Sequence, residues 1–217
     1  SIMPQGALVP VRELINYMIV VSDNEATNMR ANRVGLERIN QAMRELGAGK
    51  TMLSHLLAHN VPRILTDWNP EGSNLTTAND LAQLMALIYS NQAASPTSCQ
   101  EMQAILEKGT DGMVGYYLPL GTRVGNKVGM IFDPECGADV LDVGVINGDY
   151  ALAVMCNRIG KRKNTPKRDQ QEHSLVEEQW KAVRRSLEEI HKTDNLPFYF
   201  EVQAHPVFYQ EQHRSAG

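Results

Sequence analysis

Apolar residues recur at intervals of three and four through most of the first half of the chain, and this spacing predicts a succession of amphipathic helices. Pro10 suits the first turn of the first helix, which runs into Ser22. Thr77 and Asp80 have the spacing of a helix-capping pair. The helices that we expect cover residues 10–21, 25–33, 36–46, 78–88 and 96–108.

The segment between the third and fourth predicted helices, residues 51–74, lacks this periodicity. Pro62, Pro70 and Gly72 interrupt any regular element within it. A loop of this length inside a compact domain is usually functional or disordered. Both interpretations remain open for this loop.

The pattern changes after Gly121, where apolar residues alternate with polar ones or form short runs. Residues 123–131, 140–146 and 150–156 are predicted strands. The Asn-Gly sequence at residues 147–148 separates two of them and predicts a tight hairpin turn. A long helix is expected over residues 175–191, followed by an extended or irregular tail.

This order of elements predicts an α+β fold in which helices cover an antiparallel sheet. Two or three strands are few for a stable sheet, so either the tail supplies another strand or further strands lie upstream. We divide the chain into a mostly helical region (1–120, with an omega-type loop at about 51–75), a strand-rich region with its closing helix (121–192) and a tail (193–217).

Composition excludes several classes of function. A net charge of −4 argues against a nucleic-acid-binding surface. The chain holds three cysteines without metal-ligand spacing, and His55 and His59 have no third ligand nearby, so we expect no metal and no cofactor. No apolar stretch is long enough for a membrane span. With 217 residues, of which 42% are apolar, the chain can bury a sizeable core, and its charged fraction is ordinary for a soluble protein.

Two short motifs carry the candidate chemistry. Ser22-Asp23-Asn24 follows the first helix, and Lys127-Val128-Gly129 lies in the first predicted strand. In this order they resemble the second and third motifs of the class A β-lactamases and penicillin-binding proteins. Three surrounding blocks, residues 18–28, 75–85 and 142–146, resemble the same family in order and spacing.

The resemblance implies a helical lobe beside an α/β lobe, with the site in the cleft between them. Ser22 would pass a proton to the leaving nitrogen during acyl transfer. Asn24 would bind the acylamide of the substrate and help to hold the general-base lysine, while Asp23 would fix the local turn. Lys127 would supply positive charge for the substrate carboxylate.

Three departures from the family pattern bear on activity. No serine in the chain has a lysine three residues later, so the nucleophile and the general base have no candidates. Val128 stands where the family has Thr or Ser, beside Gly129 on the substrate side. The loop aligns Asn69 with the deacylating glutamate of the family, and Glu71 follows two residues later. Because an amide cannot accept a proton as a carboxylate does, we expect slow deacylation.

We therefore weigh three functions. The first is a β-lactamase-like serine hydrolase of the bacterial envelope, acting on a β-lactam or peptidoglycan-like substrate and represented here without its nucleophile segment. The second is a non-catalytic interaction module with the same fold. The third is a D-Ala-D-Ala peptidase or esterase of the same superfamily. If the upstream elements are missing, the exposed apolar face should bind a complementary N-terminal segment or a second copy of the chain. Extracytoplasmic location, such as the periplasm, follows from the resemblance alone.

Overall fold

The structure is a computed structural model of the chain. It describes residues 6, 8–57, 62–109, 112, 114–115, 118–133, 137–159 and 200–206, and only the backbone at 132–133, 137–138, 157–159 and 200–206. The helices are α1 (Val11–Val20), α2 (Asn24–Val34), α3 (Leu36–Glu45), α4 (Ala78–Tyr89) and α5 (Pro96–Leu106). The strands are β1 (Val124–Asp133), β2 (Gly137–Ile146), β3 (Tyr150–Ile159) and β4 (Phe200–Pro206).

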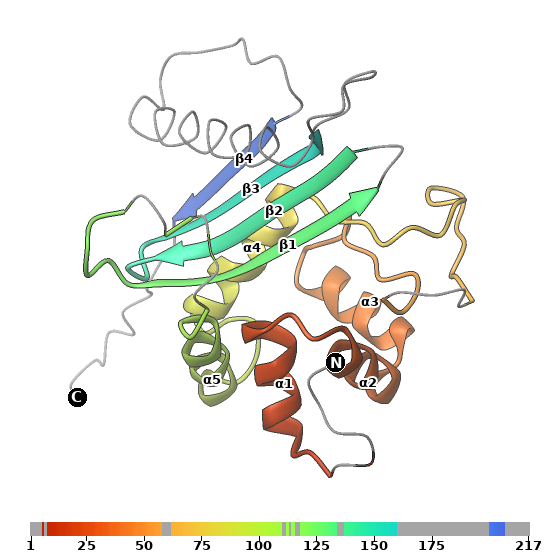
Figure 1. Ribbon diagram of the computed structural model, residues 1–217, viewed down its shortest axis with the longest axis horizontal. Coiled ribbons are helices and arrows are strands. Elements are labelled where there is room, and N and C mark those ends of the chain that lie inside the picture. The colour runs from red at the N-terminus through yellow and green to blue at the C-terminus, as the bar shows by residue number, and fades with distance from the viewer. Residues whose placement is uncertain are drawn as a thin grey trace, which may run out of the picture.

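The four strands form one antiparallel sheet in the order β1-β2-β3-β4. Helix α4 crosses one face of this sheet, and α1, α2, α3 and α5 lie on the same side of it (Figure 1). The architecture is thus the α+β fold that the sequence predicts. The expected helix over residues 175–191 lies outside the described residues, and the proposed division into regions stays a prediction.

The tail supplies the fourth strand. Residues of β4 pair with β3 from Tyr150–Pro206 to Cys156–Phe200. From its sequence, the tail (193–217) is expected to be extended or irregular, and whether it joins the sheet is left open. The pairing of β4 answers this question for residues 200–206, where a strand replaces the irregular conformation.

The hairpin between β2 and β3 has the predicted turn. Asn147 and Gly148 have φ angles of 54° and 83°, which are the positive values that a two-residue hairpin turn of this type requires. The Asn147 side chain and main chain both bond to Arg123, at the start of the neighbouring strand region. The turn therefore fixes the register in which β2 and β3 pair.

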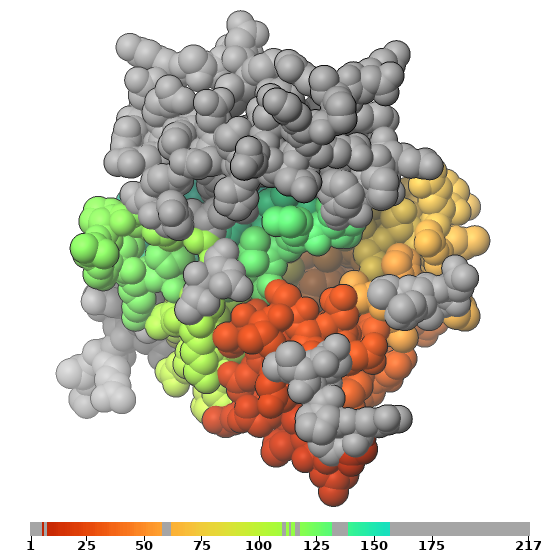
Figure 2. All heavy atoms as spheres, viewed as in Figure 1, coloured from red at the N-terminus to blue at the C-terminus, as the bar shows by residue number. Residues whose placement is uncertain are grey.

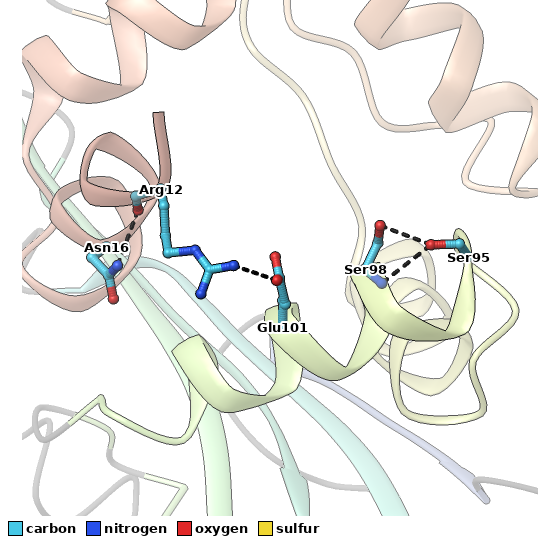
Figure 3. A network of polar contacts seen from close by, with 5 residues as sticks. All are labelled: Arg12, Asn16, Ser95, Ser98 and Glu101. Carbon is cyan, nitrogen blue, oxygen red and sulfur yellow. Dashed lines mark hydrogen bonds and ion pairs between the residues drawn. The ribbon is translucent and has the colours of Figure 1, made fainter. Parts of the chain in front are cut away.

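The helix ends follow their sequence signals. The Thr77 hydroxyl accepts a hydrogen bond from the Asp80 amide (3.1 Å) at the start of α4, as the spacing of the two residues predicts. Ser95 caps α5 in the same way, and an exposed ion pair between Arg12 and Glu101 joins α1 to α5 (Figure 3). An exposed pair of this kind contributes little stability, so the apolar packing must hold these helices.

The main core lies between α4 and the sheet. Its helical members are Ala78, Ala82, Met85, Tyr89 and Leu106, and its strand members are Val143, Val145, Ala151 and Ala153. The small side chains of α4 let the helix approach the sheet closely. In the part of the chain that the structure describes, no helix is long and apolar enough to cross a membrane.

Candidate active site

The junction of α1 and α2 presents the first motif. Asp23 is buried; its side chain accepts a hydrogen bond from the Ala26 amide (2.9 Å), and its own amide donates to the Tyr17 carbonyl (3.0 Å). These bonds cap α2 and close the turn between the helices. Ser22 and Asn24, on either side of Asp23, are exposed.

Ser22 has a left-handed backbone conformation, with φ at 53°. This region is uncommon for residues other than glycine and persists only where the surroundings impose it. Here the bonds of Asp23 impose it. The result is a serine hydroxyl held out of the helices at a fixed point.

Lys127 reaches this point from the sheet. Its ammonium group donates hydrogen bonds to the Ser22 hydroxyl and to the Val128 carbonyl. The two motifs are 105 residues apart in sequence, and this contact brings them together. A cation beside an exposed hydroxyl can lower the cost of negative charge on a bound substrate and on the oxygen itself.

The rest of the second motif lies along β1, at one end of the strand order. Lys127 pairs with Val143, Val128 with Asp142 and Gly129 with Leu141. A Cβ atom at Gly129 would lie 3.2 Å from the Leu141 side chain, which is a tight contact. The structure therefore brings Ser22, Asp23 and Asn24 together with the Lys127–Gly129 segment.

Asn69 does not join these residues. Its side chain is buried within the loop, where the amide nitrogen donates to the Ser73 carbonyl (2.8 Å) and the Ser54 hydroxyl (3.0 Å), and the oxygen accepts from the Ser73 amide (3.1 Å). These bonds fold the loop onto itself. Glu71 is exposed, and its carbonyl accepts from Arg63 (3.1 Å).

A different part of the loop contacts α2, one helical turn after the first motif. The Asn28 side chain donates to the Leu57 carbonyl (2.9 Å) and accepts from the Leu57 amide (2.8 Å). Asn24 and Asn28 are four residues apart on α2, so they lie on one face of the helix. The family resemblance aligned Asn69 with the deacylating glutamate and did not single out Leu57. The two asparagines at helical spacing were the available signal.

A cavity of about 540 Å³ opens beside Lys127. Apolar side chains from all five helices line it, together with Leu53 and Val143, and the polar lining consists of Thr27, Arg30 and Lys127. Figure 2 shows the surface hollowed between the red and orange atoms of the N-terminal helices and the green atoms of β1. The site thus combines one polar corner with a large apolar recess.

The acidic, histidine and cysteine side chains that the structure describes do not cluster at this corner. Within the described residues, no group of three or more His, Cys, Asp and Glu side chains could hold a metal ion. Two groups near the sheet have raised pKa values. Burial, reinforced by the nearby Glu107 carboxylate, raises the pKa of Tyr89 well above its usual range, and burial raises the pKa of Cys156 to about 11.

A family model described as the β-lactamase enzyme family matches residues 1–175. Among solved structures, a β-lactamase from Sphaerobacter thermophilus DSM 20745 is 32% identical, with a TM-score of 0.56, over 67% of this chain and 52% of that one. None of the curated protein sequences is significantly similar.

Two further structures share the fold. A single-residue mutant of PBP-A, solved as an acyl-enzyme complex with penicillin G, is 26% identical, with a TM-score of 0.62, over 87% of this chain and 65% of that one. The TLA-1 extended-spectrum β-lactamase, in a mutant form, is 24% identical, with a TM-score of 0.63, over 82% and 64%. The chain therefore spans between about half and two thirds of the length of these structures.

Proposed function

The chain belongs to the β-lactamase enzyme family, and we propose that it forms part of a serine acyl hydrolase that binds β-lactams or related peptidoglycan-like substrates. Ser22, Asn24 and Lys127 belong to its site. The nucleophilic serine and the general-base lysine come from a polypeptide segment outside these 217 residues. The protein acts outside the cytoplasm, in the bacterial envelope.

The contact between Lys127 and Ser22 is the observation that carries this proposal. Acyl transfer needs a hydroxyl that can pass a proton to the leaving group and a cation that binds the anionic substrate. Here the hydroxyl is exposed and held by the turn at Asp23, and the cation comes from a strand. The exposed Asn24 adds an amide for the acylamide group of the substrate.

The apolar cavity supports an external nucleophile segment. It opens beside Lys127 and is lined mostly by apolar side chains from all five helices, and apolar surface of this extent is typical of an interaction site. An amphipathic helix with an apolar face would bury this surface and bring its polar residues to Lys127 and Ser22. A complementary N-terminal segment is the occupant that we propose, and a second copy of the chain is the alternative.

Slow deacylation follows from the loop. Asn69 uses its amide to fold the loop, and the residue that α2 holds through Asn28 is Leu57, whose side chain cannot activate water. Val128 also lacks the hydroxyl that would contact the substrate carboxylate. We expect the completed protein to accumulate an acyl-enzyme, as penicillin-binding proteins do.

Burst kinetics with a chromogenic cephalosporin test this function. The intact protein should release about one equivalent of product rapidly and then turn over slowly, the kinetic sign of an accumulating covalent intermediate. Rapid steady-state turnover without a burst would contradict slow deacylation. The absence of both phases, with no covalent adduct, would favour the non-catalytic interaction module. Comparing a penicillin with a D-Ala-D-Ala peptide or a simple ester would separate the remaining substrate classes.

A further inference from the structure

A buried carboxylate that the proposed reaction does not use lies next to the Lys127–Gly129 segment. Asp142, on β2, is completely buried. One of its oxygens accepts a hydrogen bond from the Asn126 side-chain amide (2.9 Å), and the other accepts from the Val114 main-chain amide (2.7 Å). The carboxylate thus joins three segments of the chain: β1, β2 and the stretch that precedes β1.

Asn126 is closely confined at this position. A Cβ atom at Gly112 would lie 1.9 Å from the Asn126 amide nitrogen, and one at Gly144 would lie 2.9 Å from the Asn126 Cβ. The glycines therefore leave room for the asparagine and for nothing more. A buried amide–carboxylate pair with this fit permits few alternative positions for the strand.

Asn126 directly precedes Lys127 on β1, so their side chains point to opposite faces of the sheet. Asn126 faces Asp142, while Lys127 pairs with Val143, whose side chain belongs to the α4 core, and lines the cavity. Fixing Asn126 on one face fixes the rotation of β1 about its own axis. That rotation determines where the Lys127 side chain points on the other face.

We infer that Asp142 is a positioning residue, which acts through Asn126 to direct the Lys127 ammonium group toward Ser22. The inference rests on the proposed function for its consequence in catalysis. Its structural part concerns only the placement of Lys127, which can be measured without any reaction of the site.

The test compares Asp142→Ala, Asp142→Asn and the control Leu152→Ala in the intact protein. Leu152 is buried in the same sheet, on β3, so its truncation matches the loss of packing without removing the Asp142 bonds. Limiting acetic anhydride labels the lysines, and peptide mass spectrometry gives the Lys127 labelling relative to the exposed Lys50. A second readout is the rate of acylation by penicillin.

Asp142→Ala should change the Lys127-to-Lys50 labelling ratio by about threefold or more, because the environment of an amine sets its reactivity. It should slow acylation by about tenfold or more, because misplaced groups lose rate steeply. Asp142→Asn should keep both values within about twofold, because the introduced amide can donate to the Asn126 oxygen and still accept from Val114. Leu152→Ala should keep the labelling ratio.

An unchanged ratio in Asp142→Ala, or an equal change in Leu152→Ala, would overturn the inference. Equal effects of Asp142→Asn and Asp142→Ala would show that the charge of Asp142 acts, and not its position, which also contradicts the inference. If the Asp142→Ala variant does not fold, the Asn126→Ala variant, which lacks the same hydrogen bond, is measured in its place. If penicillin labels no variant, the proposed function fails while the labelling ratio still decides the role of Asp142.

Discussion

Two regions of the molecule bury their apolar surface to very different degrees. In the core between α4 and the sheet, the side chains meet partners from the same chain, and Ala82, Val145 and Ala151 are at most 1% exposed. Around α1, α2, α3 and α5, the apolar side chains surround a cavity of about 540 Å³. Nearby residues such as Met29 and Val34 are 49% and 38% exposed. The core between α4 and the sheet is closed, whereas the helices border apolar surface that nothing in the described chain covers. Outside that core, Met130 and Ile131 on β1 are also exposed, at 67% and 69%.

The difference explains how the site is built. The backbone of Lys127 belongs to β1, and its ammonium group lies at the edge of the helical region, beside Ser22. The sheet supplies a rigid support for the cation. The helices supply a space whose occupant the proposed reaction needs. Four sets of variants test whether the two regions differ in this way.

Leucine truncation should distinguish the two regions most strongly. Leu152→Ala should lower the free energy of unfolding by about 2–5 kcal/mol, because it truncates a side chain that is buried on the sheet. Leu84→Ala should cost about 1 kcal/mol or less, because Leu84 already borders an empty space and its removal creates little new cavity. Urea unfolding of both variants measures the difference. Equal costs would show that the helical region is as closed as the sheet.

Lys127→Ala tests the residue where the regions meet. It should slow acylation of the intact protein by penicillin by about 10²–10³-fold, the usual effect of removing one electrostatic donor from an acyl-transfer site. Lys50→Ala removes an exposed lysine elsewhere and should have no effect. Stopped-flow measurement of adduct formation gives both rates. A rate that survives in Lys127→Ala would remove Lys127 from the site.

Enlarging an alanine should have opposite signs in the two regions. Ala82→Leu should destabilise the protein by about 1–3 kcal/mol, because the α4–sheet core has no spare volume. Ala31→Leu should stabilise the 217-residue chain by about 0.5–2 kcal/mol, because Ala31 lines the cavity. Thermal unfolding of the pair provides the comparison. Destabilisation by both variants would mean that the cavity cannot accept more side-chain volume.

The smallest effect concerns the Cys156 thiol in the sheet. Burial raises its pKa from 9.0 to about 11, so folding disfavours the thiolate. The contribution of Cys156 to stability is complete below pH 9 and is lost as the pH rises through about 11. Cys156→Ala should flatten the decline of stability in this interval, as urea unfolding at several pH values would show. An unchanged pH dependence would contradict the burial of the thiol.

Much of the fold follows from local sequence signals. The spacing of apolar residues predicted all five described helices, and the Asn147-Gly148 pair predicted the β2–β3 hairpin. These features depend on interactions between residues close in sequence, which a pattern can reveal. The strand β4 pairs with β3 across a long separation in sequence. Apolar and polar residues alternate from Phe200 to His205, which is a local strand signal that the prediction of an irregular tail overlooked.

The site was predictable only in part for the same reason. The two motifs predicted that Ser22 and Lys127 would lie together, but this rested on resemblance and not on spacing. In the loop, Asn69 matched a family position in sequence, whereas its side chain is used to satisfy buried groups of the loop itself. Which loop residue α2 holds depends on the Asn28–Leu57 bonds, and these become visible only when the chain is folded.

We propose that a nucleophile from another polypeptide segment completes the site of this chain. Denaturing intact-mass spectrometry before and after incubation with penicillin shows which polypeptide carries that nucleophile. In a preparation that contains the complementary segment, we expect the mass of the drug to appear on that segment, and we expect these 217 residues to remain unmodified. A preparation that gains no mass although the segment is present, or an adduct on this chain, would contradict the account.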